Sequence, residues 1–410
     1  MNMHLTILLL LFFSVNTANA NIIRVGKKNI ATITEAIAIA KRYDTIFVEK
    51  GIYKEHNLVI DKPVYLMGLD KPLLDGESKY EIISVKADSV TVDGFRLQHS
   101  AISSIVDYAG IKIYNKHKVT IINNILEDTF FGVYVQYGID CVIKNNTLVA
   151  HQKEEQQSGN GIHCWKSDSI QIINNTVSGH RDGIYFEFVT HSLIWRNFSH
   201  ENLRYGLHFM FSNDDTYITN TFEGNGSGVS VMFSHGVKMF NNLFRKNWGD
   251  GAYGILFKEI SDSYGQGNIF ENNTTGVYME GASRIDFQKN TFKHNGWALK
   301  IQASCMDINL HHNNFIANTF DVATNGSLVL NNFNENYWDK YEGYDLNKDK
   351  FGDVPYHPVS MYSMIIEKNP TAVLLFRSFI TSLMDKTEKI MPGLTPENLK
   401  DNRPLMKPVL

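Results

Sequence analysis

Short segments in which apolar and polar residues alternate recur along most of the chain, and each begins with a glycine. Period-2 segments bounded by Gly and Asn are typical of short β-strands joined by tight bends. A second marker recurs with the same period, namely an asparagine followed two residues later by an apolar residue. The glycines, spaced 22 to 29 residues apart, are Gly132, Gly161, Gly183, Gly206, Gly228, Gly254 and Gly276. The asparagines are Asn124, Asn146, Asn175, Asn220, Asn242, Asn268, Asn290, Asn313 and Asn331.

This double repeat predicts a right-handed parallel β-helix. A unit of about 22 residues cannot bury its own apolar face, so successive units must stack, each strand pairing with its equivalent one coil along. About twelve coils, spaced about 4.8 Å apart, would form a rod roughly 60 Å long. Asparagine suits the bends because it tolerates the left-handed backbone region. Its amide also both donates and accepts hydrogen bonds, so we expect equivalent asparagines to form a ladder.

Helical patterns occur only towards the two ends of the predicted rod. Residues 32–42 carry apolar side chains at helical spacing and predict a helix that caps the open end of the stack. Residues 371–391, preceded by Asn369 and Pro370, predict one amphipathic helix. The expected organisation is a signal peptide (1–20), a β-helix domain (21–335), a capping region (336–364) and a C-terminal amphipathic helix with its tail (365–410).

Composition and charge narrow the class of protein. The chain has 410 residues, of which 43% are hydrophobic and 20% charged, as in folded globular proteins. A net charge of -4 offers no surface for a phosphate backbone, so nucleic acid is not an expected partner. Apolar residues 5–15 precede Ala18-Asn19-Ala20, a pattern that predicts export. The three cysteines are too few for a disulfide framework, and we expect them to be small core residues.

The outward positions of the glycine-led strands carry the candidate chemistry. The first and third residues after each glycine are apolar and should face the core, so the second and fourth should face solvent. Stacked coils then bring Met210 beside Met232, with His208 two residues from Met210 on the same strand. Imidazole nitrogen with thioether sulfur is a donor set preferred by Cu(I), so these three residues are the candidate copper ligands. The alternative is that they are ordinary surface residues, which is the more common role of histidine and methionine on the face of a sheet. Further ligands could come from His163, Glu187 or His235.

The same outward positions keep open the alternative of a periplasmic carbohydrate-binding or polysaccharide-modifying β-helix protein. Their aromatic side chains, which could stack on sugar rings, are Tyr134, Trp165, Tyr185 and Tyr278. Cleavage of a glycan is not expected, because it requires paired acid and base groups and no compact group of carboxylates occupies adjacent coils of this face. We expect Arg181-Asp182 and Asp214-Asp215 to be solvated turn residues.

Two further motifs involve possible metal ligands. Asp345, Asn347 and Asp349 resemble the opening of a calcium loop, but Lys350 stands where the turn glycine would be, so a simple turn is the favoured interpretation over calcium binding. His311 and His312 are adjacent, and consecutive side chains on a strand point to opposite faces. We therefore expect these two histidines to point apart and to have a structural role.

Five segments resemble the NosD family. They are YGLHFMFSND (205–214), GVSVMFS (228–234), GILFKEISD (254–262), GWALKIQASC (296–305) and NYWDKYEGYD (336–345). The resemblance covers nearly the whole mature chain and implies a periplasmic protein needed to mature the copper centre of nitrous oxide reductase. It implies three partners: an ABC transporter, a lipoprotein copper chaperone and the apo-reductase. The C-terminal helix would dock on the transporter's membrane subunit, which places the protein at the periphery of the inner membrane. We expect it to hold Cu(I) transiently and to be no enzyme.

Overall fold

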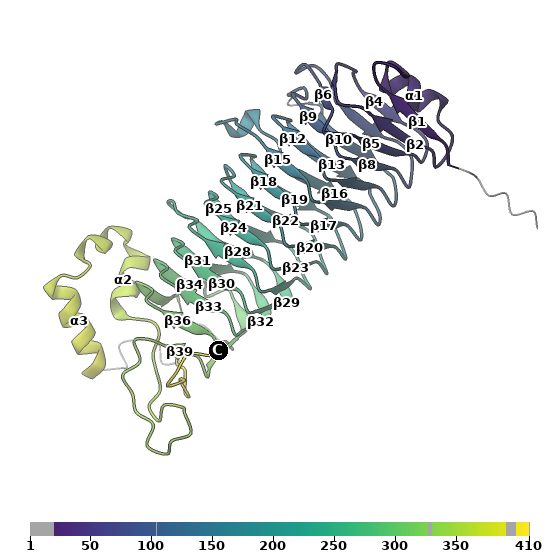
Figure 1. Ribbon diagram of the computed structural model, residues 1–410. Coiled ribbons are helices and arrows are strands. Elements are labelled where there is room, and N and C mark those ends of the chain that lie inside the picture. Colours follow the sequence, from purple (N-terminus) through teal and green to yellow (C-terminus); the bar gives the residue numbers. More distant parts are fainter. Residues whose placement is uncertain (1–19, 104, 327–329, 391–398, 410) are drawn as a thin grey trace, which may run out of the picture.

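The computed structural model of the chain describes residues 20–103, 105–326, 330–390 and 399–409, and these form a long rod with helices at both ends (Figure 1). The predicted signal peptide lies, except for Ala20, outside the described residues. Within the described residues, three parallel sheets of 14, 12 and 13 strands run along the rod, and each regular coil adds one strand to each sheet. The predicted right-handed parallel β-helix is confirmed.

The strands of each sheet follow one another at intervals of one coil. The 14-stranded sheet contains β1 (Ile22–Val25), β2 (Thr45–Val48), β5 (Tyr65–Gly68), β8 (Thr91–Asp93), β11 (Thr120–Ile122), β14 (Val142–Lys144), β17 (Gln171–Ile173), β20 (Leu193–Trp195), β23 (Thr216–Ile218), β26 (Lys238–Phe240), β29 (Ser261–Gln266), β32 (Ser283–Gln288), β35 (Met306–His311) and β38 (Asn332–Asn334). The 12-stranded sheet contains β4 (Leu58–Ile60), β7 (Ile83–Val85), β10 (Ala109–Tyr114), β13 (Phe131–Gln136), β16 (Ile162–Trp165), β19 (Asp182–Glu187), β22 (Tyr205–Met210), β25 (Ser227–Met232), β28 (Tyr253–Lys258), β31 (Thr275–Glu280), β34 (Trp297–Ile301) and β37 (Phe320–Ala323). The 13-stranded sheet contains β3 (Ile52–Tyr53), β6 (Leu73–Asp75), β9 (Arg96–Gln98), β12 (Ile125–Glu127), β15 (Thr147–Val149), β18 (Thr176–Ser178), β21 (Phe198–His200), β24 (Thr221–Glu223), β27 (Leu243–Arg245), β30 (Ile269–Glu271), β33 (Thr291–Lys293), β36 (Asn314–Ile316) and β39 (Tyr337–Trp338).

An asparagine ladder joins successive coils at the bend between the 14-stranded and 13-stranded sheets. The backbone N–H and the Nδ2 of each ladder asparagine donate to the Oδ1 of the asparagine one coil along, at 2.9 to 3.1 Å. The ladder runs through Asn124, Asn146, Asn175, Asn197, Asn220, Asn242, Asn268, Asn290, Asn313 and Asn336. The prediction of a ladder is confirmed, and its members are buried, so these bonds form out of reach of water.

Two details of the predicted ladder were wrong. Asn331 is not a member, because its Oδ1 accepts from the backbone N–H of Ile308 and the ladder continues through Asn336 instead. The left-handed backbone does not belong to the ladder asparagines either. It belongs to the residue before each one, and residues as different as Asn123, Arg196 and Thr219 adopt it, with φ of 56°, 56° and 54°. Asparagine is therefore selected for its amide rather than for its backbone freedom.

A second asparagine ladder, which the repeat analysis did not predict, borders the opposite end of the 13-stranded sheet. Backbone N–H groups again donate to the Oδ1 one coil along, at 3.0 to 3.1 Å. Its members are Asn202, Asn225, Asn247, Asn273, Asn295 and Asn318. Inside the rod, six aromatic rings stack between the ladders: Phe222, Phe244, Phe270, Phe292, Phe315 and Trp338.

The repeated glycines open the strands of the 12-stranded sheet because the backbones of adjacent coils approach closely there. A Cβ on Gly228 would lie 2.3 Å from the carbonyl oxygen of Gly254, which is far inside van der Waals contact. The two longest glycine-led coils carry inserts at residues 151–158 and 248–252, and both inserts form loops. Residues 151–158 include the short 3₁₀-helix η1 (Glu155–Gln157). The first sheet has 14 strands, whereas about twelve coils were expected. The expectation was too low because the first coils lack the glycine and asparagine markers.

Helix α1 (Ile33–Ile39) covers the first coil, as the 32–42 pattern predicted. The Thr32 side chain accepts from the N–H of Glu35 and begins the helix, while Ile33, Ala36 and Ile37 are buried against the first strands. This helix closes the apolar interior that an open coil would expose.

One helix was predicted for the C-terminal extension, but the structure has three short helices there. They are α2 (Met361–Lys368), the 3₁₀-helix η2 (Pro370–Leu375) and α3 (Phe379–Ile390). The helical backbone is interrupted between η2 and α3 at Arg377, whose φ is +62°. Helix α2 packs on the last strands of the 12-stranded sheet through Tyr362 and Ile366, which contact Phe320. No helix among the described residues is long and apolar enough to span a bilayer.

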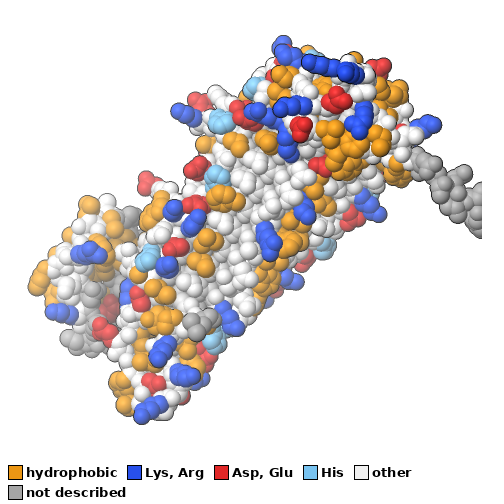
Figure 2. Space-filling model, viewed as in Figure 1, with side chains coloured by type: hydrophobic (Ala, Val, Ile, Leu, Met, Phe, Trp, Pro, Cys, Tyr) orange, Lys and Arg blue, Asp and Glu red, His pale blue; other side chains and the backbone are white. Residues whose placement is uncertain are grey.

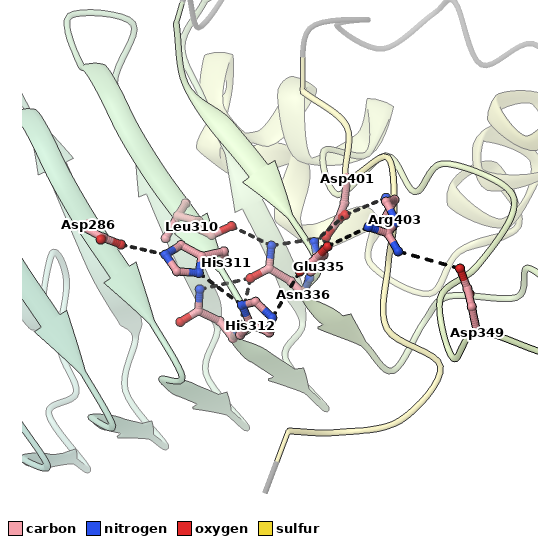
Figure 3. A network of polar contacts seen from close by, with 10 residues as sticks. Asp286, Leu310, His311, His312, Glu335, Asn336, Asp349, Asp401 and Arg403 are labelled. Atoms are coloured by element: carbon pink, nitrogen blue, oxygen red, sulfur yellow. Dashed lines mark hydrogen bonds and ion pairs between the residues drawn. The ribbon is translucent and has the colours of Figure 1, made fainter.

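The end of the chain returns to the rod and closes it. Within residues 399–409, Asp401 takes the place of the next ladder asparagine: its Oδ2 accepts from the backbone N–H and the Nδ2 of Asn336, at 2.9 and 3.2 Å, and from Trp338 Nε1 at 3.1 Å. Asp401 is fully buried, and Arg403 beside it contacts Glu335 at 3.0 Å (Figure 3). The tail thus continues the ladder by one position, because Asp401 accepts the hydrogen bonds of its last asparagine.

We predict that Asp401→Ala destabilises the chain by about 3 kcal/mol, because it leaves buried donors of Asn336 and Trp338 without an acceptor. Asp401→Asn keeps one acceptor oxygen and should destabilise less. The urea midpoint checks the order wild type, Asp401→Asn, Asp401→Ala, and equal midpoints for wild type and Asp401→Ala would show that the tail does not cap the ladder. Limited proteolysis should release the tail first in the alanine variant.

Candidate functional site

The register of the 12-stranded sheet places the predicted outward residues in two columns. The histidine column consists of Tyr134, His163, Tyr185, His208 and Ser230. The methionine column consists of Gln136, Trp165, Glu187, Met210, Met232 and Lys258. Each residue is the direct pairing partner of the next in its column, so the predicted lateral contacts between coils are present.

The histidine column is buried, although its residues point away from the interior of the coil. His163 and His208 are 9% and 5% exposed. The rings of Tyr134, His163, Tyr185 and His208 follow one another at centroid distances of 4.5, 4.8 and 5.0 Å. Tyr205 adds a ring 4.9 Å from His208. Aromatic neighbours one coil apart therefore shield one another from water, which the alternation rule alone did not anticipate.

A buried carboxylate orients His208. Asp182 accepts from Arg204 through both oxygens, at 3.0 and 2.8 Å, and its Oδ2 lies 3.5 Å from His208 Nδ1. Burial alone would raise the pKa of Asp182, but the hydrogen bonds from His208 and Arg204 outweigh it and hold that pKa below its usual value. The expectation that Asp182 is a solvated turn residue was wrong: it is fully buried, and so is Asp215.

The other ring nitrogen of His208, Nε2, is available to bind a ligand. His208 Nε2 is buried and has no hydrogen-bond partner, and the same is true of Ser230 Oγ on the neighbouring strand. Because Nδ1 faces Asp182, the ring is held with Nε2 on the side away from that carboxylate. An orphaned imidazole nitrogen in a buried site is unusual and points to a partner that the protein chain itself does not supply.

The methionine column presents two thioethers beside this imidazole. Met210 and Met232 are direct pairing partners on β22 and β25, and both are partly buried. Met210 and His208 lie two residues apart on β22 and share its outward face. Glu187 is the pairing partner of Met210 on the other side, and Lys258 follows Met232. The three residues proposed from the sequence are therefore neighbours on one surface.

A row of phenyl rings borders the methionine column, and the repeat analysis missed it. Phe188, Phe211 and Phe233 stack at centroid distances of 5.2 and 5.0 Å, with Phe188 and Phe211 exposed. Each has left-handed backbone, with φ of 54°, 51° and 53°, at the bend where the strand ends. All three occupy the fifth position after a repeat glycine, so alignment of that position would have revealed this phenylalanine row.

The three further candidate ligands, His163, Glu187 and His235, lie at different positions relative to His208 and Met210. His163 is two coils from His208, with Tyr185 between them, and its Nδ1 contacts Asn160 Nδ2 at 3.0 Å. Glu187 adjoins Met210, as described above. His235 follows the bend at Phe233, is exposed, and pairs there with Ser261, so it belongs to the next side of the rod.

Within the part of the chain that the structure describes, no three His, Cys, Asp or Glu side chains gather closely enough to hold an ion. Any metal on this face therefore depends on thioether sulfur. In the predicted calcium loop, Asp345, Asn347 and Asp349 accept from backbone N–H groups of the loop itself, which is the bonding of a turn. The cysteines, all free and buried as expected, are Cys141, Cys164 and Cys305.

A separate hollow lies between the last coil and the helical extension. Its volume is about 900 Å³, and its lining includes Asp321, Tyr356, Arg377 and Thr381. It is several coils away from Met210 and shares no lining residue with the histidine or methionine column.

The sequence of this chain is similar to one protein family and to two proteins with the same name. Residues 149–343, which include both columns from His163 onwards, match the family model "NosD: Periplasmic copper-binding protein (NosD)". A protein of Pseudomonas aeruginosa named "Probable ABC transporter binding protein NosD" is 27% identical over 370 residues, covering 86% of each chain. A protein of the same name from Stutzerimonas stutzeri is 25% identical over 368 residues, covering 85% of this chain and 84% of that protein.

Solved structures share the fold at low sequence identity. The catalytic unit of a GH87 α-1,3-glucanase from Streptomyces thermodiastaticus has a TM-score of 0.57 at 11% identity and covers 78% of this chain and 69% of that one. PfbA, a surface adhesin of Streptococcus pneumoniae, has a TM-score of 0.52 at 12% identity, covering 71% and 86%. These likenesses concern the β-helix and carry no functional argument.

We predict that two buried histidines, His163 and His180, lower the free energy of unfolding in mild acid. Burial lowers the pKa of His180 to about 4 and that of His163 to about 3, so below pH 6.5 only the unfolded chain binds these protons. Stability should therefore fall as the pH drops from 6.5 towards 4, by about 1.4 kcal/mol per pH unit for each histidine.

The variant His180→Asn tests this directly. His180 precedes Asn202 in the second ladder, since its N–H donates to Asn202 Oδ1, so asparagine fits the position. The urea midpoint of this variant should change less between pH 6.5 and 4.5 than that of wild type, whereas the exposed-site control His294→Gln should keep the wild-type change. An unaltered pH dependence in His180→Asn would contradict the prediction.

Proposed function

We propose that this chain, as a member of the NosD family, is a periplasmic accessory protein that carries copper for the maturation of nitrous oxide reductase. The family description supports copper binding in the periplasm, and the names of the two relatives support association with an ABC transporter. The finer role, transfer of copper from a lipoprotein chaperone to the apo-reductase, rests on the resemblance to the family. We propose no bond-making catalysis, only binding and transfer of the ion.

The pairing of Met210 with Met232 beside the orphaned His208 Nε2 is the observation that carries this proposal. Two thioethers and one imidazole are soft and borderline donors, which select Cu(I) over Mg²⁺ or Ca²⁺. All three are neutral ligands, so a monovalent ion keeps its charge and can leave without a proton transfer. Such a donor set suits an ion that is cargo rather than a permanent cofactor.

The surroundings of these donors favour a weakly hydrated ion. The phenylalanine row borders the methionine column on one side, and the partly buried rings of Tyr185 and Tyr205 pack against His208 on the other. Apolar walls limit the access of water to a bound metal, and sulfur contacts favourably with ring edges. The Asp182–Arg204 pair would act as a positioning element that fixes the His208 ring, since it contacts only Nδ1.

The C-terminal extension is the proposed contact with the transporter's membrane subunit. Its exposed apolar side chains are Val373, Leu374, Leu375, Phe376, Phe379, Ile380 and Leu383. Figure 2 shows hydrophobic side chains on the surface of this end of the rod. A concentration of exposed apolar side chains on one short segment is typical of a protein or membrane contact. Helix α3 has 12 residues, which is too short to cross a bilayer that needs about 20.

Carbohydrate binding is the second candidate, and one observation favours it. Trp165, Phe188 and Phe211 present rings along the same side of the rod, as in sites that stack on sugars. The buried carboxylate of this face, Asp182, is already paired with Arg204 and its pKa is lowered, which suits it poorly to the role of a general acid. Sugar binding without turnover is therefore the form that this alternative takes.

We predict that the variant His208→Gln/Met210→Leu/Met232→Leu binds Cu(I) at least 100-fold more weakly than wild type, because it removes all three soft donors. Competition with a chromophoric Cu(I) chelator under anaerobic conditions measures the affinity. The matched control His294→Gln/Met306→Leu changes an exposed histidine and an exposed methionine elsewhere on the rod and should bind as wild type does. Undiminished affinity in the triple variant would exclude this site, and binding of uronate oligomers without copper affinity would favour the second candidate.

We predict that Leu374→Asp/Phe379→Asp abolishes co-purification with the transporter and leaves Cu(I) affinity unchanged. The two side chains are 86% and 81% exposed, so charge at these positions should prevent docking on an apolar surface without unfolding the rod. The control Ile52→Asp alters an exposed apolar residue at the opposite end and should co-purify normally. Retention of the complex by the double variant would refute docking through this surface.

A further inference from the structure

The rings of His311 and His312, at the end of β35, lie next to each other (Figure 3). The two Nδ1 atoms are 3.1 Å apart. The expectation that these adjacent side chains point apart was wrong, because the strand ends at His311 and His312 takes left-handed backbone, with φ of 55°. The bend turns the second ring back towards the first.

Carboxylates hold the outer nitrogens of both rings. His311 Nε2 contacts Asp286 Oδ1 at 2.9 Å, and His312 Nε2 contacts Glu335 Oε2 at 3.1 Å. An ionised carboxylate only accepts hydrogen bonds, so His311 Nε2, hydrogen-bonded to Asp286, carries hydrogen. His312 Nε2 lies at ion-pair distance from Glu335, which favours hydrogen on that nitrogen too. In the neutral rings each Nδ1 then bears a lone pair, and the two facing lone pairs repel each other unless a proton or a metal ion lies between them.

We propose that His311 and His312 bind a divalent metal ion of the Zn²⁺ or Cu²⁺ type through their Nδ1 atoms. A metal-bound histidine almost always donates its other N–H to a carboxylate or carbonyl, which Asp286 and Glu335 provide here. At metal–nitrogen distances of about 2.0 to 2.1 Å, nitrogens 3.1 Å apart subtend an angle of roughly 100° at the ion, close to tetrahedral. A linear two-coordinate Cu(I) ion would instead need nitrogens about 4 Å apart.

This site is distinct in position and chemistry from the thioether patch. It lies at the bend after the 14-stranded sheet, near the end of the rod, and it contains nitrogen donors without sulfur. The His311 and His312 side chains are 30% and 38% exposed, so water or a ligand from a partner can complete the coordination. Glu335 also contacts Arg403 of the capping tail, so a bound ion would be linked to the closure of the rod through one carboxylate.

Titration of the full mature chain with Zn²⁺ alone, in competition with a chromophoric chelator, tests the proposal. Wild type should bind one Zn²⁺ equivalent that His311→Gln and His312→Gln each lose or bind at least 10-fold more weakly. His294→Gln, which alters an exposed histidine at another bend with φ of 56°, should bind as wild type does. The His208→Gln/Met210→Leu/Met232→Leu variant should also keep this equivalent, which separates this proposal from the proposed function.

Two further measurements protect the test against a folding defect. Asp286→Asn leaves both ligands in place and should weaken Zn²⁺ binding about 10-fold to 100-fold, since the carboxylate supports only one ring. Electron paramagnetic resonance of the wild-type chain with one equivalent of Cu²⁺ should show hyperfine coupling to two imidazole nitrogens. Absence of that signal, absence of Zn²⁺ binding by wild type, or unchanged binding by both histidine variants would overturn the proposal.

Discussion

The in-register pairing of each coil with the next is the constraint on which the rest of this structure depends. It is enforced by the asparagine ladder, in which one buried Oδ1 accepts both the backbone N–H and the Nδ2 of the asparagine in the preceding coil. A shift of the pairing register by one residue would leave several buried amide groups without partners in every coil. The summed free-energy cost would far exceed the free energy of unfolding of an ordinary domain. Insertions are tolerated only as loops, as at residues 151–158, because the ladder resumes in register after them.

The same register turns residues that are distant in sequence into a surface. Met210 and Met232 are 22 residues apart in sequence and direct partners in space, and the same holds for the phenyl rings beside them. The ion pair of buried Asp182 with partly exposed Arg204 adds what register alone cannot supply, because it fixes the orientation of one imidazole. A rigid scaffold with soft, neutral donors on one side is well suited to hold an ion without activating it.

The two ends of the rod are closed by different means, and the difference has a mechanical consequence. Helix α1 covers the first coil with apolar side chains, whereas the last coil is closed by hydrogen bonds to Asp401 in the returning tail. The C-terminal extension is therefore held to the rod at two places, by α2 on the 12-stranded sheet and by residues 399–409 on the last coil. The exposed apolar residues of η2 and α3 lie between these two attachments, so force applied there would be transmitted to the rod.

The sequence by itself determined the fold, the lateral order of the coils and the meeting of Met210 with Met232, because parallel stacking converts a period directly into contacts. Only the tertiary structure decided what the period does not encode. Burial of Asp182 depends on Arg204 in the next coil, and capping by Asp401 joins the tail to a coil some 65 residues earlier. The bend at His312 recurs in every coil of the asparagine ladder, but the convergence of two histidines there depends on the residues that this coil alone places at the bend. The break at Arg377 lies outside the repeat. A repeat fixes translation along an axis and the bends of each coil, whereas caps and buried charges depend on contacts that occur once.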